Sequence, residues 1–312
     1  MMPLKFPTSL KPGDSVIAIA TSGAVKDVKA LEAGLAVWRS RGYQVTLDDN
    51  WDARQGYLAG DDTTRRNALT QAWNDPQCKA ILCIRGGYGS ARLLENWNQT
   101  VPGNPSPMPS KWIIGFSDVT ALLWSLATEG IASLHGPILT TLDQEPIWSQ
   151  QRMFDYLEGG NLESLQGKGW GRGIAEGILL PANLSVATHI LGTPLQPSLK
   201  GTILALEDIN EYPYRIDRML TQWRLMGVLS GVKGIALGRF SRCEADPGSI
   251  STNAGEVLRD RLSDLEIPIV SDLPFGHDGC NAVLPVGHHV RLDGDRGELS
   301  FLRDEGLLRD KE

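Results

Sequence analysis

The chain has 312 residues, 41% hydrophobic and 21% charged, which is typical of a globular protein large enough for two domains. Its formal net charge of -7 would repel a phosphate backbone, and no Lys/Arg run offsets that charge, so nucleic acid is not an expected partner. No apolar run approaches the roughly 18 residues of a membrane-spanning helix, and residues 16–20 are too few for a signal segment. We therefore expect a soluble, cytoplasmic protein without a membrane partner. The four cysteines show no C-x-x-C spacing and are interpreted as reduced thiols.

Strands and helices alternate through the first half of the chain. Short apolar runs predict strands, and Leu or Trp at helical spacing predicts the helices between them. The expected strands are 15–20, 44–47, 80–84, 112–114 and 131–134, and the expected helices begin near residues 28, 62 and 119. Asp61 or Asp62 could cap the second helix. This alternation predicts an open parallel sheet with helices on both faces, whose ligands would bind at the carboxyl ends of the strands.

The periodicity fades between Gln144 and Arg172, where five glycines accumulate. Further along, strands are expected at 202–206 and 234–237, helices at 214–226 and 254–265, and a hairpin turn at 293–295. The predicted organisation is α/β: an N-terminal domain over 1–150, a linker or mobile loop over 151–172, and a smaller, mixed, strand-rich C-terminal domain over 173–312.

The first segment with chemical potential is Arg85-Gly86-Gly87-Tyr88-Gly89, which follows a predicted strand. Backbone N–H groups of Gly86 or Gly87 can approach an anion closely because no Cβ stands in the way. The loop could complete an oxyanion hole or bind a phosphate, although it matches neither a P-loop nor G-x-G-x-x-G. The alternative is a tight turn between a strand and a helix.

Gly115-Phe116-Ser117-Asp118 offers a nucleophile, because it joins a strand to a helix as a nucleophile elbow does. The helix N-terminus would direct partial positive charge at the site. Val119 stands where the G-x-S-x-G elbow has its second glycine. The alternative is that Ser117 or Asp118 only caps the helix.

A serine nucleophile needs a base, and His277 lies in the turn-rich segment 275–279 from which it could project. His135, at the end of the fifth strand, is held in reserve as a base or substrate contact. Glu207 ends an apolar strand and could orient the imidazole, with Asp208 as its rival. Because strand side chains alternate, only one of these two carboxylates should face the histidine. Nucleophile and partners would then come from different domains and meet at a cleft.

Together these segments resemble the serine L,D-carboxypeptidases that trim murein peptides, a family that includes the microcin C self-immunity hydrolases. The resemblance rests on five motifs in order: Gly13-Asp14, Arg85 to Gly89, Gly115 to Asp118, Glu207-Asp208 with Tyr214 to Arg218, and Gly276-His277 with Asn281, Leu284, Pro285 and Gly287. It implies Ser117 as nucleophile, His277 as base and Glu207 as its orienter. It also implies oxyanion donors at Asp118 and at Gly86 or Gly87, no metal or cofactor, and a homodimer.

The expected activity is removal of the terminal D-alanine from a murein tetrapeptide through an acyl-enzyme on Ser117. One alternative is an amidase acting on peptidyl or aminoacyl nucleotides, with segment 144–171 as its recognition loop. Another is a non-catalytic module that binds an anionic ligand at Gly86 and Gly87. Many relatives also carry Gly-Gly-Asn-Leu where this chain has Pro181-Ala182-Asn183-Leu184, so Ala182 would be strained if that turn needs a positive φ.

Overall fold

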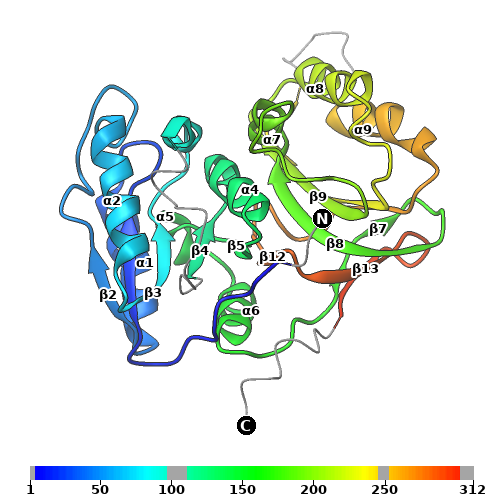
Figure 1. Cartoon of the computed structure of the whole chain (residues 1–312). Helices are drawn as coiled ribbons and strands as arrows, with labels where there is room; N and C mark the ends of the chain where they lie inside the picture. Colours follow the sequence, from blue (N-terminus) through cyan, green and yellow to red (C-terminus); the bar gives the residue numbers. More distant parts are fainter. Residues whose placement is uncertain (1–3, 97–110, 245–252, 303–312) are drawn as a thin grey trace. The chain divides into compact units, whose positions relative to one another are not determined.

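The computed structural model describes residues 4–96, 111–244 and 253–302, and the chain divides into two compact units between Gly160 and Asn161 (Figure 1). We call them the N-terminal and C-terminal units. The expected α/β class, with a parallel sheet between helices and a strand-rich C-terminal part, is confirmed. Within the described ranges no helix is both long and apolar enough to cross a membrane.

The N-terminal unit contains a parallel sheet in the order β5-β4-β3-β1-β2. Its strands are β1 (Ser15–Ile19), β2 (Gln44–Leu47), β3 (Cys78–Cys83), β4 (Trp112–Gly115) and β5 (Ser133–His135). Its helices are α1 (Val28–Ser40), α2 (Asp62–Asn74), α4 (Thr120–Thr128), α5 (Leu139–Leu142) and α6 (Ile147–Leu157), with 3₁₀ turns η1 (Ser90–Asn96) and η2 (Ser117–Val119). In β3 only Lys79 is exposed, as expected of a strand covered on both faces.

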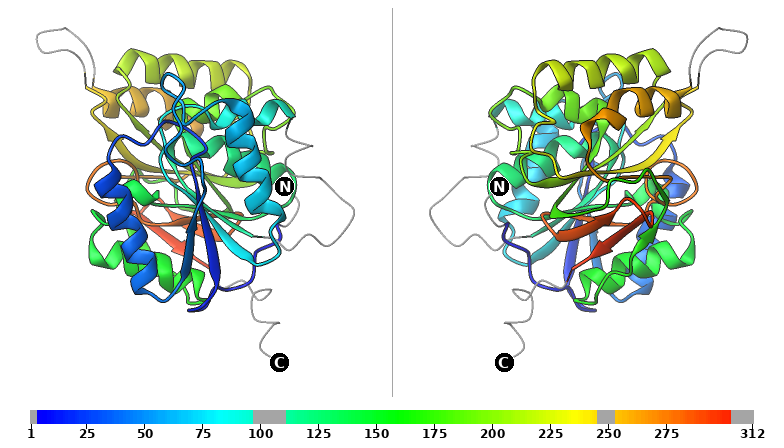
Figure 2. Two further views of the ribbon diagram at one scale, coloured as in Figure 1. Left: turned by 90° about the vertical axis from the view of Figure 1, so that its left-hand side faces the viewer. Right: turned by 90° about the vertical axis from the view of Figure 1, so that its right-hand side faces the viewer.

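The strand order reverses beside β1, because the chain runs from β1 outward to β2 and then back across β1 to β3. Right-handed crossovers place the two connecting helices on opposite faces, and the left view of Figure 2 shows the sheet between α1 and α2. The carboxyl ends of β1 and β3 therefore form a topological switch point, where α/β sheets bind ligands. Asp27 caps α1 by accepting from the Ala30 N–H at 3.0 Å, and Asp61 caps α2 by accepting from the Thr64 N–H at 2.6 Å.

The C-terminal unit is built on a mixed sheet in the order β6-β14-β13-β8-β9-β10-β11-β7. Strands β8 to β11 are parallel and the others add antiparallel edges. Its strands are β6 (Leu165–Gln166), β7 (Lys168–Gly169), β8 (Ile174–Asn183), β9 (Thr202–Ile209), β10 (Gly234–Ser241), β11 (Ile269–Ser271), β12 (Leu284–Val286), β13 (His289–Asp293) and β14 (Glu298–Phe301), with β12 outside this sheet. Its helices are α7 (Leu184–Ile190), α8 (Pro213–Leu225) and α9 (Ala254–Leu262), with η3 (Ser263–Leu265).

The core of this unit gathers fully buried side chains from β8, β9 and β13, among them Leu179, Ile203 and Val290. Phe275, in the loop after β11, belongs to the same cluster and is completely buried. The loop that carries His277 is thus anchored in the core two residues before the imidazole.

Two expectations differ from the structure. The segment expected to be a linker or mobile loop, 151–172, contains most of α6 together with β6 and β7. Helix α6 buries Phe154, Tyr156 and Leu157, so this part of the chain packs as core. The expected strain at Ala182 is absent, because this residue lies within β8, pairs with Leu206 and does not have a positive φ.

Candidate active site

Ser117 starts the turn η2 and is separated from the end of β4 by Phe116 alone. Its φ of 61° lies in the left-handed region, which residues other than glycine rarely adopt, so the backbone is strained there. Neither η2 nor α4 has a side-chain cap, so the alternative that Ser117 or Asp118 caps the helix is wrong. The strained turn at a strand end has the form expected of a nucleophile elbow.

The glycine of this elbow is required by packing. A Cβ on Gly115 would lie 3.0 Å from Cγ1 of Val119, which is completely buried. Val119 therefore fills the position of the second elbow glycine without disturbing the turn, because its side chain packs back over Gly115.

The loop after β3 approaches Ser117 closely. A Cβ built on Gly86 would lie 3.2 Å from both Cβ and Oγ of Ser117 and 3.9 Å from the backbone nitrogen of Asp118. Gly87 has a φ of 107°, which favours glycine. Gly86 and the Asp118 nitrogen, two of the positions expected to supply oxyanion donors, therefore lie beside Ser117 within the N-terminal unit, and Gly87 is the next residue of the same loop.

Buried polar contacts hold this loop to the elbow. One carboxylate oxygen of Asp118 accepts from the Ser90 N–H at 2.8 Å, and the Ser90 hydroxyl donates to the Asp118 carbonyl. Arg65, which is 1% exposed, donates to the carbonyls of Thr21 at 2.5 Å and Gly89 at 2.7 Å, and it pairs with Asp62. The Gly-rich loop is thereby fixed at its C-terminal end. A preorganised loop of this kind suits the binding of a developing negative charge.

Glu207 and His277 meet in the C-terminal unit. Oε2 of Glu207 lies 2.6 Å from Nδ1 of His277, and Glu207 is completely buried two residues before the end of β9. A carboxylate on Nδ1 favours the tautomer with the proton on that nitrogen, so Nε2 is the basic nitrogen of the ring. Gly276 donates its N–H to Oδ1 of Asn281 at 3.1 Å, which fixes the loop beside the imidazole.

Asp208 has a different role from its neighbour. Its Oδ2 accepts from the N–H and the hydroxyl of Ser185, at 2.8 and 2.7 Å. Burial, and then the nearby charge of Glu207, raise its pKa to about 6. Nδ2 of Asn183 donates to Glu207 at 3.2 Å and to Asp208 at 3.1 Å, so one amide links the two carboxylates.

Sequence reasoning had singled out Asn183 only as part of an unusual turn. It is 3% exposed and also caps α7 by accepting from the Val186 N–H at 3.1 Å. The signal that could have revealed it is an Asn at the end of an apolar strand, directly before a helix. His135, the reserve base, is completely buried and packs edge-on against Phe116, with ring centroids 5.9 Å apart.

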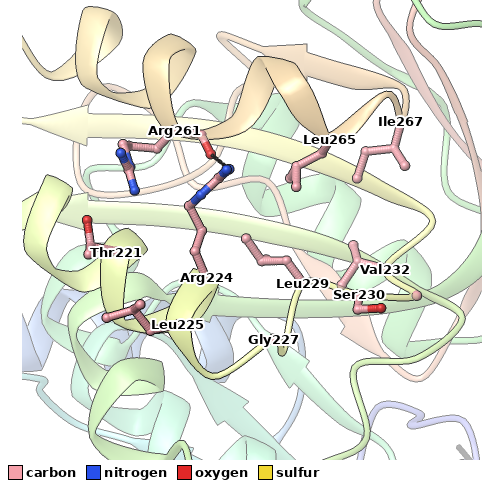
Figure 3. Close-up of a pocket in the computed structure, with 11 residues that line it drawn as sticks. Thr221, Arg224, Leu225, Gly227, Leu229, Ser230, Val232, Arg261, Leu265 and Ile267 are labelled. Carbon is pink, nitrogen blue, oxygen red and sulfur yellow. Dashed lines mark hydrogen bonds between the residues drawn. The ribbon is translucent and has the colours of Figure 1, made fainter.

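A cavity of about 520 Å³ lies between α8 and α9 of the C-terminal unit (Figure 3). Its two arginines already have partners: Arg224 pairs with Asp264 at 2.6 Å, and Arg261 lies 3.5 Å from Asp217. None of the predicted site residues lines this cavity, so it is not part of the candidate active site.

Two family models match the chain. Residues 16–136 match the N-terminal domain of LD-carboxypeptidases, and residues 176–292 match the C-terminal domain of the same proteins. A Synechocystis protein provisionally named carboxypeptidase slr1534 is 55% identical over 95% of this chain and 97% of its own. The murein tetrapeptide carboxypeptidase of Pseudomonas aeruginosa is 29% identical over 92% of this chain and 95% of its own.

Solved structures have the same fold. The muramoyltetrapeptide carboxypeptidase of Oxalobacter formigenes superposes with a TM-score of 0.80 at 30% identity, covering 91% of this chain and 97% of its own. The structure of MccF with glutamyl sulfamoyl guanosine gives a TM-score of 0.84 at 21% identity, covering 96% and 98% of the two chains.

Proposed function

The chain belongs to the LD-carboxypeptidase family, and from that membership we propose that it is a serine carboxypeptidase that removes the terminal D-alanine of murein tetrapeptides. Relatives named as murein peptide carboxypeptidases support the substrate class. The observation that carries the mechanism is the hydrogen bond between buried Glu207 and His277, because a carboxylate on Nδ1 is what a histidine base needs.

In the proposed reaction, Nε2 of His277 takes the proton of the Ser117 hydroxyl while Oγ attacks the carbonyl carbon of the scissile bond. The oxyanion that forms accepts from the Asp118 N–H and from Gly86 or Gly87. When the carbonyl re-forms, the C–N bond breaks and His277 gives its proton to the amine of the departing D-alanine. Water activated by the same imidazole then hydrolyses the acyl-enzyme.

The test is release of D-alanine from a synthetic murein tetrapeptide, followed by mass spectrometry. Ser117→Ala should lower kcat by at least about 10³-fold, since a missing triad member leaves only binding and oxyanion stabilisation. Ser40→Ala removes an exposed hydroxyl that bonds to the Val37 carbonyl at the end of α1, and serves as the matched control. Full activity of Ser117→Ala would refute the mechanism.

The two alternatives are separable in the same preparation. An aminoacyl sulfamoyl nucleoside, of the kind bound to MccF in its solved structure, tests for the amidase as an analogue of an aminoacyl nucleotide. Covalent labelling by a fluorophosphonate that is lost in Ser117→Ala would exclude a non-catalytic binding module. The proposed homodimer is checked by sedimentation of the wild-type chain.

A further inference from the structure

A second cavity lies within the N-terminal unit, next to the Gly-rich loop. It has a volume of about 260 Å³ and is lined by loop residues that follow three neighbouring strands of the sheet. After β1 come Gly23, Ala24 and Lys26; after β2 come Arg54, Gly56 and Tyr57; and after β3 come Arg85, Gly87 and Tyr88. We call this cavity the switch-point pocket, since β1 and β3 are the strands beside which the strand order reverses.

The charge of this pocket is entirely positive. Lys26, Arg54 and Arg85 line it, and no acidic side chain does, in this fully described stretch of residues 23–88. The whole chain has a formal net charge of -7, so three cations in one small cavity contrast with the rest of the molecule. A concave site with cations of one sign attracts an anionic ligand.

The two arginines are held in place without being neutralised. Arg54 donates to the Val25 carbonyl at 2.6 Å, and Arg85 donates to the Ala24 carbonyl at 3.2 Å. A guanidinium carries five N–H donors and each of these bonds uses one, so donors remain for a planar anion. Carboxylates and phosphates are the anions that a guanidinium binds through two parallel hydrogen bonds.

The pocket also has an aromatic wall. Tyr57 is 64% exposed and Tyr88 is 50% exposed, and their ring centroids lie 5.9 Å apart. Exposed tyrosines side by side give a ligand apolar contact area at little cost in side-chain entropy.

The position of the pocket relative to Ser117 identifies the anion. Arg85 directly precedes Gly86, whose added Cβ would lie 3.2 Å from Oγ of Ser117, and the Gly23 N–H donates to the Gly86 carbonyl at 3.0 Å. An enzyme that removes only the last residue must recognise the free carboxylate within one residue of the bond it cuts. The pocket meets that need, because its Arg85 is adjacent in sequence to Gly86, the residue that contacts the serine.

We propose that Lys26, Arg54 and Arg85 bind the free α-carboxylate of the substrate's C-terminal residue and so restrict the enzyme to the end of the peptide. This assignment rests on the proposed carboxypeptidase function and extends it by naming the group that distinguishes a terminal residue from an internal one.

The experiment compares a murein tetrapeptide ending in D-alanine with the same peptide ending in D-alanine amide. The wild type should favour the acid, and Arg54→Gln and Arg85→Gln should each lower the acid-to-amide ratio of kcat/KM by about 10- to 100-fold, mainly through KM. Lys26→Gln should lower it less, since an exposed lysine is a flexible point charge. The matched control is Lys29→Gln. Lys29 lies three residues after Lys26, on α1 and outside the pocket, so its replacement should leave the acid-to-amide ratio of kcat/KM unchanged.

Binding of the two peptides to Ser117→Ala, measured by calorimetry, separates this assignment from the proposed reaction because it needs no turnover. A preference for the acid that Arg54→Gln abolishes supports the pocket even if the wild type releases no D-alanine. Equal binding of acid and amide, or a ratio unchanged in both arginine variants of an active enzyme, would overturn the assignment. Arg54 is exposed, so its variant tests the pocket even if Arg85→Gln fails to fold.

Discussion

Oε2 of Glu207 lies 2.6 Å from Nδ1 of His277, and the carboxylate is completely buried while the imidazole side chain is 14% exposed. A buried carboxylate without partners would be costly, and this one has two, the imidazole and the Asn183 amide. The pair is therefore arranged to hold one tautomer of an accessible histidine.

Replacing Glu207 by Gln should lower kcat by about 10²- to 10⁴-fold, because a neutral amide neither fixes the Nδ1 proton nor stabilises the imidazolium. Steady-state kinetics on the tetrapeptide measure the effect, and circular dichroism checks the fold. Glu176→Gln makes the same change at an exposed position of β8 and should retain full activity. Equal kcat for Glu207→Gln and wild type would show that the carboxylate is only structural.

The strain at Ser117 predicts an unusual order of stability. Ser117→Gly removes the Cβ that conflicts with a φ of 61°, whereas Ser117→Ala keeps it. After the greater flexibility of glycine in the unfolded chain is allowed for, Ser117→Gly should be more stable than Ser117→Ala by about 0.5–1 kcal/mol. Urea denaturation of both inactive variants measures the difference.

The control for this comparison is a glycine in an ordinary helix. Ala36→Gly, at an exposed position within α1, should lower the free energy of unfolding by about 1 kcal/mol. The two Ala-to-Gly comparisons thus have opposite signs, and a loss of stability at position 117 would contradict the elbow geometry.

Much of this arrangement could be predicted from the sequence, where local rules decide the structure. Helical spacing and a capping Asp61 located α2, and the apolar run 112–114 before Gly115 located β4 and the serine after it. Helix α6 was missed because it starts after Pro146 without a side-chain cap and the glycines that follow dominate the pattern. Strand alternation separated Glu207 from Asp208, but it could not name Asn183 as the amide between them, since that contact joins β8 to β9.

The switch-point pocket was beyond sequence reasoning for a related reason. Lys26, Arg54 and Arg85 lie in three separate loops and form no run of charge along the chain. Only the order of β2, β1 and β3 in the sheet brings them together.

Replacing Gly86 by a larger residue should lower activity but leave the stability of the fold nearly unchanged. Its φ is not positive, so alanine fits the backbone, but the new Cβ would lie 3.2 Å from Oγ of Ser117 and displace the hydroxyl by a few tenths of an ångström. We expect Gly86→Ala to lower kcat/KM by about tenfold with little change in melting temperature, because small misplacements of reacting groups are costly. Gly87→Ala, at a φ of 107°, should instead lower the melting temperature. Unchanged kcat/KM in Gly86→Ala would argue against close contact with the serine.

The raised pKa of Asp208 should make the stability of the folded chain depend on pH. Burial, then the charge of Glu207, raise its pKa from 3.8 to about 6, so between these two values the folded chain holds a proton that the unfolded chain releases. The stabilisation from this group is complete below about pH 4 and is lost as the pH rises through about 6, and two pKa units amount to about 3 kcal/mol. Asp208→Asn cannot titrate, so the difference in unfolding free energy between wild type and variant should change by up to that amount between pH 4 and pH 7. Urea denaturation at intervals of half a pH unit gives the free energy of unfolding of both proteins as a function of pH. If the two curves stay parallel between pH 4 and pH 7, the Asp208 carboxylate is as easily ionised in the folded chain as in the unfolded one.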